Sequence, residues 1–363
     1  MHRFEKMVKE VFDHYDDETN MILEQTKDKQ IVIFGAGELG HKVYNILKSR
    51  EIPVKCFCDN KVSGRTDSRT GLKVVSLNEL KEEVSKLFIL IAVFDAEGYM
   101  AVRRQLLDFG LEDGHLKNSK MLSERLPIAF LEENLEKYRE AYSLLEDDFS
   151  KEVYLNKIKK VYLHSDISDI VSDEQEEYFD KEVLLTDEEV FVDCGGFDGD
   201  TALKFIDKVN GRFQKIIIFE PDETKVNRLR ERMEGYNYDF YQYGVWSRRA
   251  VLKFDARIGL GSCISEDGKV EIEARALDDV LREDIPTYIK MDIEGSEIEA
   301  LKGGRGIIQK YKPKLAVCIY HKPKDLFEIP IMLKEMCGDY KLFVRQYANS
   351  MSETVCYAIW GER

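Results

Sequence analysis

The chain has 363 residues, more than one hydrophobic core usually organises, so we expect two domains. Hydrophobic residues make up 44% and charged residues 34%, and no apolar run reaches the roughly 20 residues that a membrane helix needs. The formal net charge of -15 argues against nonspecific nucleic-acid binding, which relies on basic surface. The N-terminus lacks the apolar stretch of a secretory signal, which predicts a cytoplasmic location.

The first third of the chain is predicted to hold an N-terminal helix and a small parallel sheet. Apolar residues recur at helical spacing over residues 1–27. Between residues 28 and 120, apolar strands such as IVIF and LFILIAV alternate with helical patterns, and residues 60–72 read as an exposed loop. Such alternation predicts a Rossmann-like domain with parallel strands.

A glycine-rich turn follows the first of these strands. Gly35, Gly37 and Gly40 have the G-x-G-x-x-G spacing and precede a helix, and Asp59 ends the next strand. This context predicts a second nucleotide site, with phosphate at the helix N-terminus and Asp59 near a ribose. NAD binding, nucleotide or nucleotide-sugar binding, and a purely structural domain are the alternatives.

The segment FCDN and the later GLKVVSLNEL also resemble the small Rossmann-like domain that is attached to bacterial sugar-modifying enzymes, such as sialic-acid-type acetyltransferases. That resemblance implies a pocket for a nucleotide-sugar or a scaffolding role. No group of residues suited to hydride transfer is visible after this domain.

The rest of the chain is predicted to form a helical segment and a second sheet domain. Residues 121–186 are helical and highly charged, and form a connector or a lid. Residues 187–363 hold strands near 190–194, 215–220, 239–243, 286–292, 314–320, 340–346 and 354–360, with an inserted hairpin near 250–254 and 270–275. The last two strands leave no room for a helix between them, so they form an antiparallel hairpin. The predicted fold class is therefore α/β, with two Rossmann-like domains. The closing hairpin is typical of a class I methyltransferase sheet.

A second glycine loop opens this C-terminal domain. Asp193, Gly195 and Gly199 lie in the sequence DCGGFDGDT after an apolar strand, and Gly195 and Gly199 allow a sharp turn close to a ligand. Asp200 or Thr201 is expected to cap the following helix. The D-x-G-x-x-x-G spacing is the one that methyltransferases use around the amino-acid end of S-adenosylmethionine. Glu220 ends the next strand, where a carboxylate can accept hydrogen bonds from both ribose hydroxyls.

The C-terminal half resembles the FkbM family of methyltransferases. The resemblance rests on VFVDCGGFDGDT, on FEPD at 219–222 and on IKMDIEGSEIEALKGG at 289–304, and it covers about residues 160–350. It implies methyl transfer from S-adenosylmethionine to a hydroxyl group of a sugar-containing small molecule or a secondary metabolite. The residues expected to contact this cofactor are Asp193, Gly195, Gly196, Gly199, Thr201, Glu220, Gly244, Val245 and Asp292.

Three further residues are predicted to act on the acceptor hydroxyl. Asp292 and Glu294 follow the fourth strand and His321 follows the fifth, at the edge where ligands bind in open α/β sheets. We expect His321 to be the general base, because the ordinary pKa of histidine suits proton transfer near neutral pH. Asp292 or Glu294 would then orient the acceptor.

Alternatives remain for these residues. Asp292 and Glu294 are the ligands if the enzyme uses Mg²⁺. In a purely structural interpretation, Glu294 caps the helix that begins at Gly295, and His321 only bonds to the loop. Glu297 is expected to be a solvated or capping charge. Tyr178 covers the cofactor or packs in the core.

The seven scattered cysteines favour neither disulfides nor structural zinc, and we predict no metal site. A homo-oligomer is compatible with the sequence. The rival functions are an NAD-dependent oxidoreductase that uses the N-terminal glycine turn, and a non-catalytic module that binds nucleotide-sugars.

Overall fold

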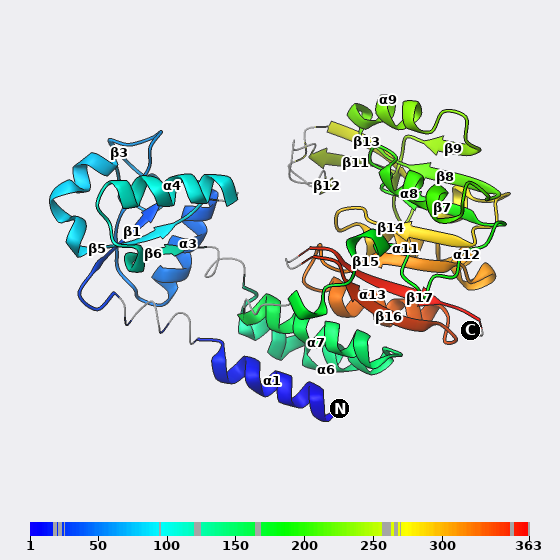
Figure 1. The fold of residues 1–363 in the computed structure, drawn as a ribbon, viewed down its shortest axis with the longest axis horizontal. Helices are drawn as coiled ribbons and strands as arrows, with labels where there is room; N and C mark the ends of the chain where they lie inside the picture. The colour runs from blue at the N-terminus through cyan, green and yellow to red at the C-terminus, as the bar shows by residue number, and fades with distance from the viewer. Residues whose placement is uncertain are drawn as a thin grey trace. The chain divides into compact units, whose positions relative to one another are not determined.

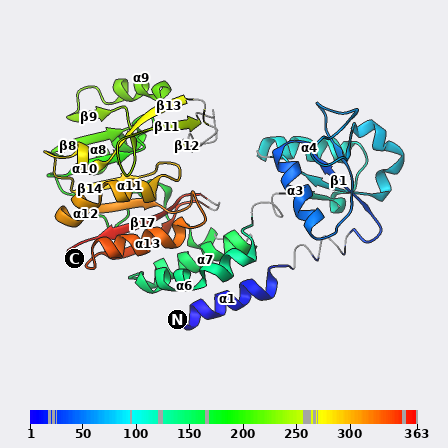
Figure 2. The ribbon, with the colours of Figure 1, turned by 180° about the vertical axis from the view of Figure 1, so that it is seen from behind.

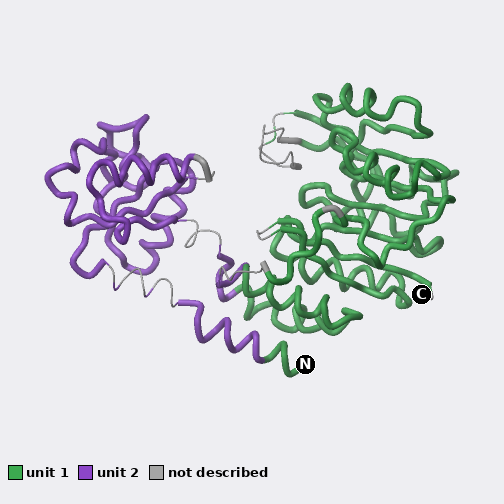
Figure 3. The backbone as a smooth tube through the Cα atoms, viewed as in Figure 1, with its two compact units in different colours: residues 1–5, 130–160, 165–363 green, residues 6–129, 161–164 purple. Residues whose placement is uncertain are grey.

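The computed structural model describes residues 1–16, 20, 24, 26–93, 96–119, 125–163, 168–255, 263–264, 268, 270–348 and 352–361. The chain divides into two compact units, which are coloured separately in Figure 3. The C-terminal unit contains residues 1–5, 130–160 and 165–363, and the N-terminal unit contains residues 6–129 and 161–164. The helix predicted over residues 1–27 is observed as α1 (His2–His14), and much of the remainder of that prediction lies outside the described residues.

The N-terminal unit is built on a sheet with the strand order β3-β4-β2-β1-β5-β6. All its pairings are parallel except that of β3 with β4. The strands are β1 (Gln30–Phe34), β2 (Val54–Cys58), β3 (Arg65–Thr66), β4 (Lys73–Val75), β5 (Leu87–Ile91) and β6 (Leu116–Asn118). The connecting helices are α3 (Glu38–Ser49), the 3-10 helix η1 (Leu77–Lys86), α4 (Ala96–Asp108) and the 3-10 turn η2 (Asp113–His115).

Both faces of this sheet are buried. Ile31 and Ile33 of β1 belong to one hydrophobic core, and Val32 and Phe34 belong to another on the opposite face. Successive side chains of a strand point to opposite faces, so a strand with two covered faces reads as one continuous apolar run. This explains why IVIF was recognisable as a strand in the sequence.

The C-terminal unit is built on a sheet with the order β16-β17-β15-β14-β7-β8-β9 (Figure 1). Strands β15, β14, β7, β8 and β9 run parallel to one another. Strand β17 is antiparallel to both β15 and β16, so the predicted closing hairpin is confirmed. The strands are β7 (Val190–Cys194), β8 (Lys215–Phe219), β9 (Tyr238–Tyr241), β14 (Tyr288–Met291), β15 (Lys314–Cys318), β16 (Lys341–Gln346) and β17 (Thr354–Ile359).

Helices connect the parallel strands of this sheet. They are α8 (Asp200–Lys208), α9 (Glu223–Arg232), α10 (Leu277–Val280), α11 (Glu297–Gly303), α12 (Arg305–Tyr311) and α13 (Asp325–Met336). The predicted insertion is a second sheet with the order β10-β13-β11-β12, in which β11 and β13 are antiparallel. Its strands are β10 (Gly244–Val245), β11 (Ala250–Asp255), β12 (Cys263–Ile264) and β13 (Val270–Arg275).

The helical segment between the sheets contains α6 (Ile128–Leu144) and α7 (Asp148–Leu163), which run side by side in both views (Figures 1 and 2). Most of both helices belongs to the C-terminal unit. The turn between them is tied to β16, because the buried Arg345 pairs with Asp147 and donates to the Ser150 hydroxyl. The 3-10 turns η3 (Ser168–Ile170) and η4 (Glu174–Glu176) follow. None of the helices in the described part of the chain has the length and apolar character of a membrane span.

Candidate functional site

Four predicted site residues of the C-terminal unit lie at one edge of its seven-stranded sheet. Strands β15, β14, β7 and β8 are adjacent and parallel, so their carboxyl ends share an edge. Asp193 lies in the last part of β7, and Glu220 directly follows β8. Asp292 directly follows β14, and His321 lies in the loop after β15. Ligands of open α/β sheets bind at this edge.

The loop after β7 is held tightly between the two neighbouring strands. The backbone N–H groups of Gly195 and Gly196 both donate to the Phe219 carbonyl, at 2.9 and 3.0 Å. A Cβ at Gly195 would lie 1.9 Å from the Asp292 carbonyl oxygen, and one at Gly196 would lie 2.2 Å from Ile218. These glycines therefore serve close packing of the loop against β14 and β8.

Alanine at Gly195 is expected to lower the free energy of unfolding by about 2–4 kcal/mol. Gly195 has a φ of +85°, where a Cβ costs about 1–2 kcal/mol, and overpacking adds about 1–3 kcal/mol. The matched control is Gly338→Ala, since a Cβ there meets nothing within 4 Å. Urea unfolding of the three proteins measures the difference, and equal stabilities would contradict the packing argument.

The helix after the loop begins differently from the prediction. The N-cap of α8 is Gly199, with a φ of 86°, and Asp200 follows it in the first turn, where its Oδ1 accepts from the Thr201 N–H at 2.7 Å. Thr201 is buried in the first turn. The left-handed backbone at this position is what requires glycine.

Asp193 lies beneath the loop rather than on its surface. Its side chain is fully buried, and one carboxylate oxygen is 3.0 Å from Lys290 Nζ. Burial raises the pKa of Asp193 to about 6, although Lys290 acts in the opposite direction. Lys290 also donates to the Gly195 carbonyl at 2.8 Å. The pair thus anchors the glycine loop to β14, and the sequence prediction did not include Lys290.

Glu220 connects the end of β8 to the same loop. Its Oε2 accepts from the Phe197 N–H at 2.9 Å, and its Oε1 accepts from the Asp222 N–H at 2.7 Å. Burial raises the pKa of Glu220 to about 7, against these two hydrogen bonds, which lower it. Each carboxylate oxygen has a second lone pair that a ligand hydroxyl can use. Gly244 and Val245 lie apart from this loop in sequence and form β10, a buried strand of the inserted sheet.

Asp292 is held by hydroxyl donors. The Tyr178 hydroxyl donates to Oδ2 at 2.8 Å, and the Tyr320 hydroxyl lies 3.4 Å from Oδ1. Burial alone would raise the pKa of Asp292, but Lys290, His321 and the Tyr178 hydrogen bond hold it below its ordinary value. Asp292 is therefore a carboxylate at neutral pH. Tyr178 itself is buried.

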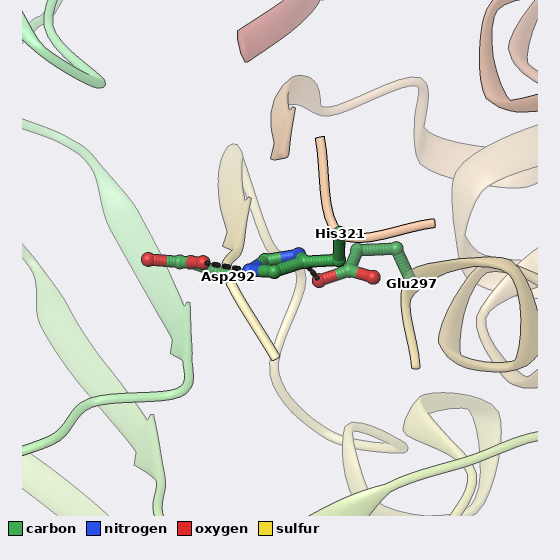
Figure 4. Close-up of side chains that lie close together, drawn as sticks. All are labelled: Asp292, Glu297 and His321. Carbon is green, nitrogen blue, oxygen red and sulfur yellow. Dashed lines mark ion pairs between the residues drawn. The ribbon is translucent and has the colours of Figure 1, made fainter. Parts of the chain in front are cut away.

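The sequence prediction of an ordinary pKa for His321 was wrong. Burial would lower the pKa of its imidazole, but Glu297, Asp292 and Glu294 together raise it to about 9. Nδ1 is 3.0 Å from Glu297 Oε1, and Nε2 is 3.4 Å from both Asp292 Oδ1 and Glu294 Oε2. Figure 4 shows the ring between Asp292 and Glu297. Because the ligand-free imidazole is protonated at neutral pH, it must lose that proton before it acts as a base.

Two glutamates near His321 also differ from the predictions. Glu297 is fully buried instead of solvated, and its Oε1 accepts from the Ile293 N–H at 2.9 Å. Glu294 does not cap a helix, because α11 begins at Glu297 with Ser296 as its N-cap. Burial raises the pKa of Glu294, and the charge of His321 lowers it. A glutamate in the first turn of a helix usually faces solvent, so no pattern in the sequence indicated the burial of Glu297.

Two more carboxyl groups, those of Glu177 and Glu353, lie close to each other in the C-terminal unit. Burial and a hydrogen bond with the Glu353 carboxyl raise the pKa of Glu177 to about 9. Glu177 is therefore protonated at neutral pH. Tyr178, Glu294 and Glu353 all have left-handed backbone, with φ values of 66°, 55° and 59°. Such strained residues gather at functional sites, where the surrounding structure holds them in place.

The glycine turn of the N-terminal unit has the predicted shape. A Cβ at Gly35 would lie 2.6 Å from the Ala92 carbonyl oxygen, and a Cβ at Gly40 would lie 2.0 Å from the Gly35 carbonyl oxygen. Gly37 is the N-cap of α3, and a Cβ there meets nothing within 4 Å. The expected orientation of Asp59 toward a ribose is not what the structure shows. Its carboxylate accepts from the backbone N–H groups of Ala36, Lys61 and Val62.

A pocket of 370 Å³ adjoins Asp59 at the carboxyl ends of β2 and β4. Most of its lining side chains are polar, and Asn60 and Gln105 bond to each other within it. The lining residues are Asp59, Asn60, Ser76, Leu77, Asn78, Gln105, Asp108 and Phe109. Phosphate groups are usually bound by basic side chains or by backbone N–H groups, and this lining contains no lysine or arginine.

Comparisons with known proteins lead to the same family that the C-terminal sequence motifs resemble. Residues 193–349 match the family model of the methyltransferase FkbM domain, and residues 27–116 match that of the C2185-like N-terminal domain. The chain is similar to the crystal structure of methyltransferase FkbM from Methylobacillus flagellatus KT. The TM-score is 0.64 at 21% identity, and the match covers 97% of this chain and 99% of that one. The resemblance to the FkbM family is therefore confirmed for the C-terminal half, and the similar structure supports the fold.

Other solved structures match only parts of the chain. A fibrillarin/Nop5p complex has 17% identity and a TM-score of 0.34, covering 49% of this chain and 75% of that one. A precorrin-6y C5,15-methyltransferase from Geobacter metallireducens GS-15 has 11% identity and a TM-score of 0.33, covering 54% and 94%. These scores carry no argument about function. The search of curated proteins gives no match.

Proposed function

We propose that this chain, whose residues 193–349 form an FkbM-type methyltransferase domain, transfers a methyl group from S-adenosylmethionine to a hydroxyl group. The acceptor class that we propose is a saccharide, a nucleotide-sugar or a secondary metabolite. The observation that carries the proposal is the glycine loop after β7, joined to Glu220 at the end of the neighbouring strand. This arrangement places a tight glycine turn and one carboxylate, which can accept from ribose hydroxyls, at the ligand-binding edge of the sheet.

The residues beyond the loop support transfer to a hydroxyl group. Methyl transfer from a sulfonium is an in-line displacement, so the protein must align the acceptor oxygen and remove its proton. Asp292 is an ionised carboxylate held by tyrosine hydroxyls, and His321 and Glu294 lie beside it. In this proposal the three side chains orient the acceptor hydroxyl and receive its proton, after which the oxygen attacks the methyl carbon and the sulfonium leaves as a thioether.

Calorimetric titration with S-adenosylmethionine, S-adenosylhomocysteine and NAD⁺ tests the cofactor. We expect micromolar binding of both adenosyl ligands. Affinity for S-adenosylmethionine should fall about tenfold between pH 8 and pH 6, because the Glu220 pKa of about 7 converts its carboxylate to a neutral acid as the pH falls. The protonated group loses acceptor capacity for the ribose hydroxyls.

The variant Glu220→Gln is the matched control for this titration. It should bind S-adenosylmethionine about tenfold or more weakly at pH 8, since hydrogen bonds to a charged group contribute about 1.5–3 kcal/mol. Its affinity should change little between pH 8 and pH 6. Binding of NAD⁺ alone would contradict the methyltransferase proposal and favour an oxidoreductase that uses the N-terminal unit.

For the N-terminal unit we propose a small polar ligand such as the sugar part of a nucleotide-sugar. The pocket beside Asp59 offers amide side chains from Asn60, Asn78 and Gln105, which suit sugar hydroxyls. The same calorimeter, with uridine and cytidine diphosphate sugars, provides the test. If the Asn78→Leu variant still gives the binding heat of the wild type, the nucleotide-sugar binds outside this pocket.

A further inference from the structure

The imidazole of His321 points between two carboxylates that reach it from a different loop. Its Nε2 lies 3.4 Å from Asp292 Oδ1 and 3.4 Å from Glu294 Oε2. The His321 side chain is only 8% exposed, and its Nε2 has no hydrogen-bond partner of good geometry. A buried histidine nitrogen without such a partner, aimed at two carboxylates, is the arrangement from which metal sites are made.

We propose that His321 Nε2, Asp292 and Glu294 bind a divalent transition-metal ion, with Mn²⁺ as its representative. Metal bonds to imidazole nitrogen and carboxylate oxygen are about 2.0–2.2 Å long, which sets neighbouring ligand atoms roughly 3–3.5 Å apart. The two spacings around Nε2 lie within that range.

Two further residues, Glu297 and Tyr178, support the proposed metal ligands. Glu297 Oε1 lies 3.0 Å from His321 Nδ1 and is itself fixed by the Ile293 N–H. A carboxylate behind Nδ1 selects the tautomer that leaves Nε2 free to bind metal. The Tyr178 hydroxyl occupies Asp292 Oδ2 at 2.8 Å, which leaves Oδ1 for the ion. Ligating carboxylates in metal sites are commonly supported by such hydrogen bonds.

The charge of the cluster also favours a divalent cation. Asp292, Glu294 and Glu297 place three carboxyl groups around one imidazole. A divalent cation at Nε2 would offset the negative charge of these carboxylates. An imidazole ligand favours first-row transition metals over Mg²⁺, which prefers oxygen and water. The proposed site therefore differs from the Mg²⁺ alternative with only Asp292 and Glu294.

The role of the ion in catalysis rests on the proposed function. With an ion bound, Asp292, Glu294 and His321 would hold the metal, and the acceptor proton would leave to water instead of to these side chains, because the ion would make a neighbouring hydroxyl more acidic. The oxygen then attacks the methyl carbon, and the carbon–sulfur bond breaks to leave the neutral thioether. The binding site itself is tested without any methyl acceptor.

The test titrates Mn²⁺ into the full chain after treatment with EDTA and dialysis, with free Mn²⁺ followed by electron paramagnetic resonance. We expect one ion per chain and at least a hundredfold weaker binding of Mg²⁺ in competition. Glu294→Gln and His321→Ala should each weaken Mn²⁺ binding at least tenfold. Asp339→Asn changes an exposed carboxylate that pairs with Lys312, and it should leave the affinity unchanged.

Titration of S-adenosylmethionine on the same samples separates the two proposals. Binding of S-adenosylmethionine without Mn²⁺ binding would overturn the metal site and leave the proposed function intact. Mn²⁺ binding without S-adenosylmethionine binding would support the site and remove the proposed function. Glu294 is 41% exposed, so Glu294→Gln is expected to fold, and an unchanged Mn²⁺ affinity in that variant would also overturn the metal site.

Discussion

Replacing Lys290 with methionine is expected to lower the free energy of unfolding by about 3–5 kcal/mol. Lys290 is 2% exposed and Asp193 is fully buried, so the substitution leaves a buried carboxylate without its cation. It also removes the donor to the Gly195 carbonyl. Urea unfolding followed by circular dichroism measures the loss. Affinity for S-adenosylmethionine should fall as well, because the glycine loop loses its anchor on β14.

The control for this prediction is Lys312→Met. Lys312 pairs with Asp339 at the surface, where an ion pair contributes about 0–1 kcal/mol.

The double variant Asp193→Asn with Lys290→Met should recover much of the lost stability, because it leaves no unpaired charge. Asp193→Ala alone should destabilise the fold and abolish cofactor binding. Similar unfolding curves for Lys290→Met and Lys312→Met would contradict a structural role for the pair.

The sequence was sufficient to predict the framework of the C-terminal site. Strands buried on both faces, such as β7 and β14, appear as short apolar runs, and a run followed by glycines marks a turn at the carboxyl end. Parallel strands bring those ends to one edge. The placement of Glu220, Asp292 and His321 at the same edge follows from this rule, even though a hundred residues separate the first from the last.

The sequence was not sufficient to predict the electrostatics of that edge. The protonation of His321 depends on Glu297, whose burial results from the packing of α11 and not from its own chemistry. The pairing of Glu177 with Glu353 joins two distant segments, and no spacing rule connects them. One buried ion pair could have been predicted from the sequence. Lys290 is a charged residue inside an apolar strand, and such a residue needs a buried partner of opposite charge.

In the N-terminal unit, too, the sequence predicts the backbone of the glycine turn but not the bonding of the nearby side chain. Gly35, Gly37 and Gly40 form the turn that their spacing predicts, because each is close to backbone or at a helix N-terminus. Asp59 has the expected position at the end of β2, but its carboxylate bonds to three backbone N–H groups. The motif predicts the position of Asp59 in the backbone. It does not predict the hydrogen-bond partners of the carboxylate, because nearby backbone N–H groups compete with a ligand for it.

Replacing His321 with alanine is expected to slow methyl transfer by about 10²–10⁴-fold, the usual contribution of a side chain that moves a proton or holds the reacting group. The affinity for S-adenosylmethionine should stay within about threefold, because the glycine loop and Glu220 do not contact His321 in the described structure. The measurements are single-turnover rates with saturating cofactor and calorimetric titration of S-adenosylmethionine. A fold check by circular dichroism accompanies both.

Glu297→Gln separates a direct role of His321 from a structural one. The amide oxygen keeps an acceptor for Nδ1 and for the Ile293 N–H but removes the charge, so we expect a rate loss of about 10–100-fold with unchanged stability. If His321 acts on the acceptor, the rate falls in the order wild type, Glu297→Gln, His321→Ala, at constant cofactor affinity. If His321→Ala lowers rate, cofactor affinity and stability together, the imidazole is a structural partner of the three carboxylates, and the proton must leave by way of Asp292.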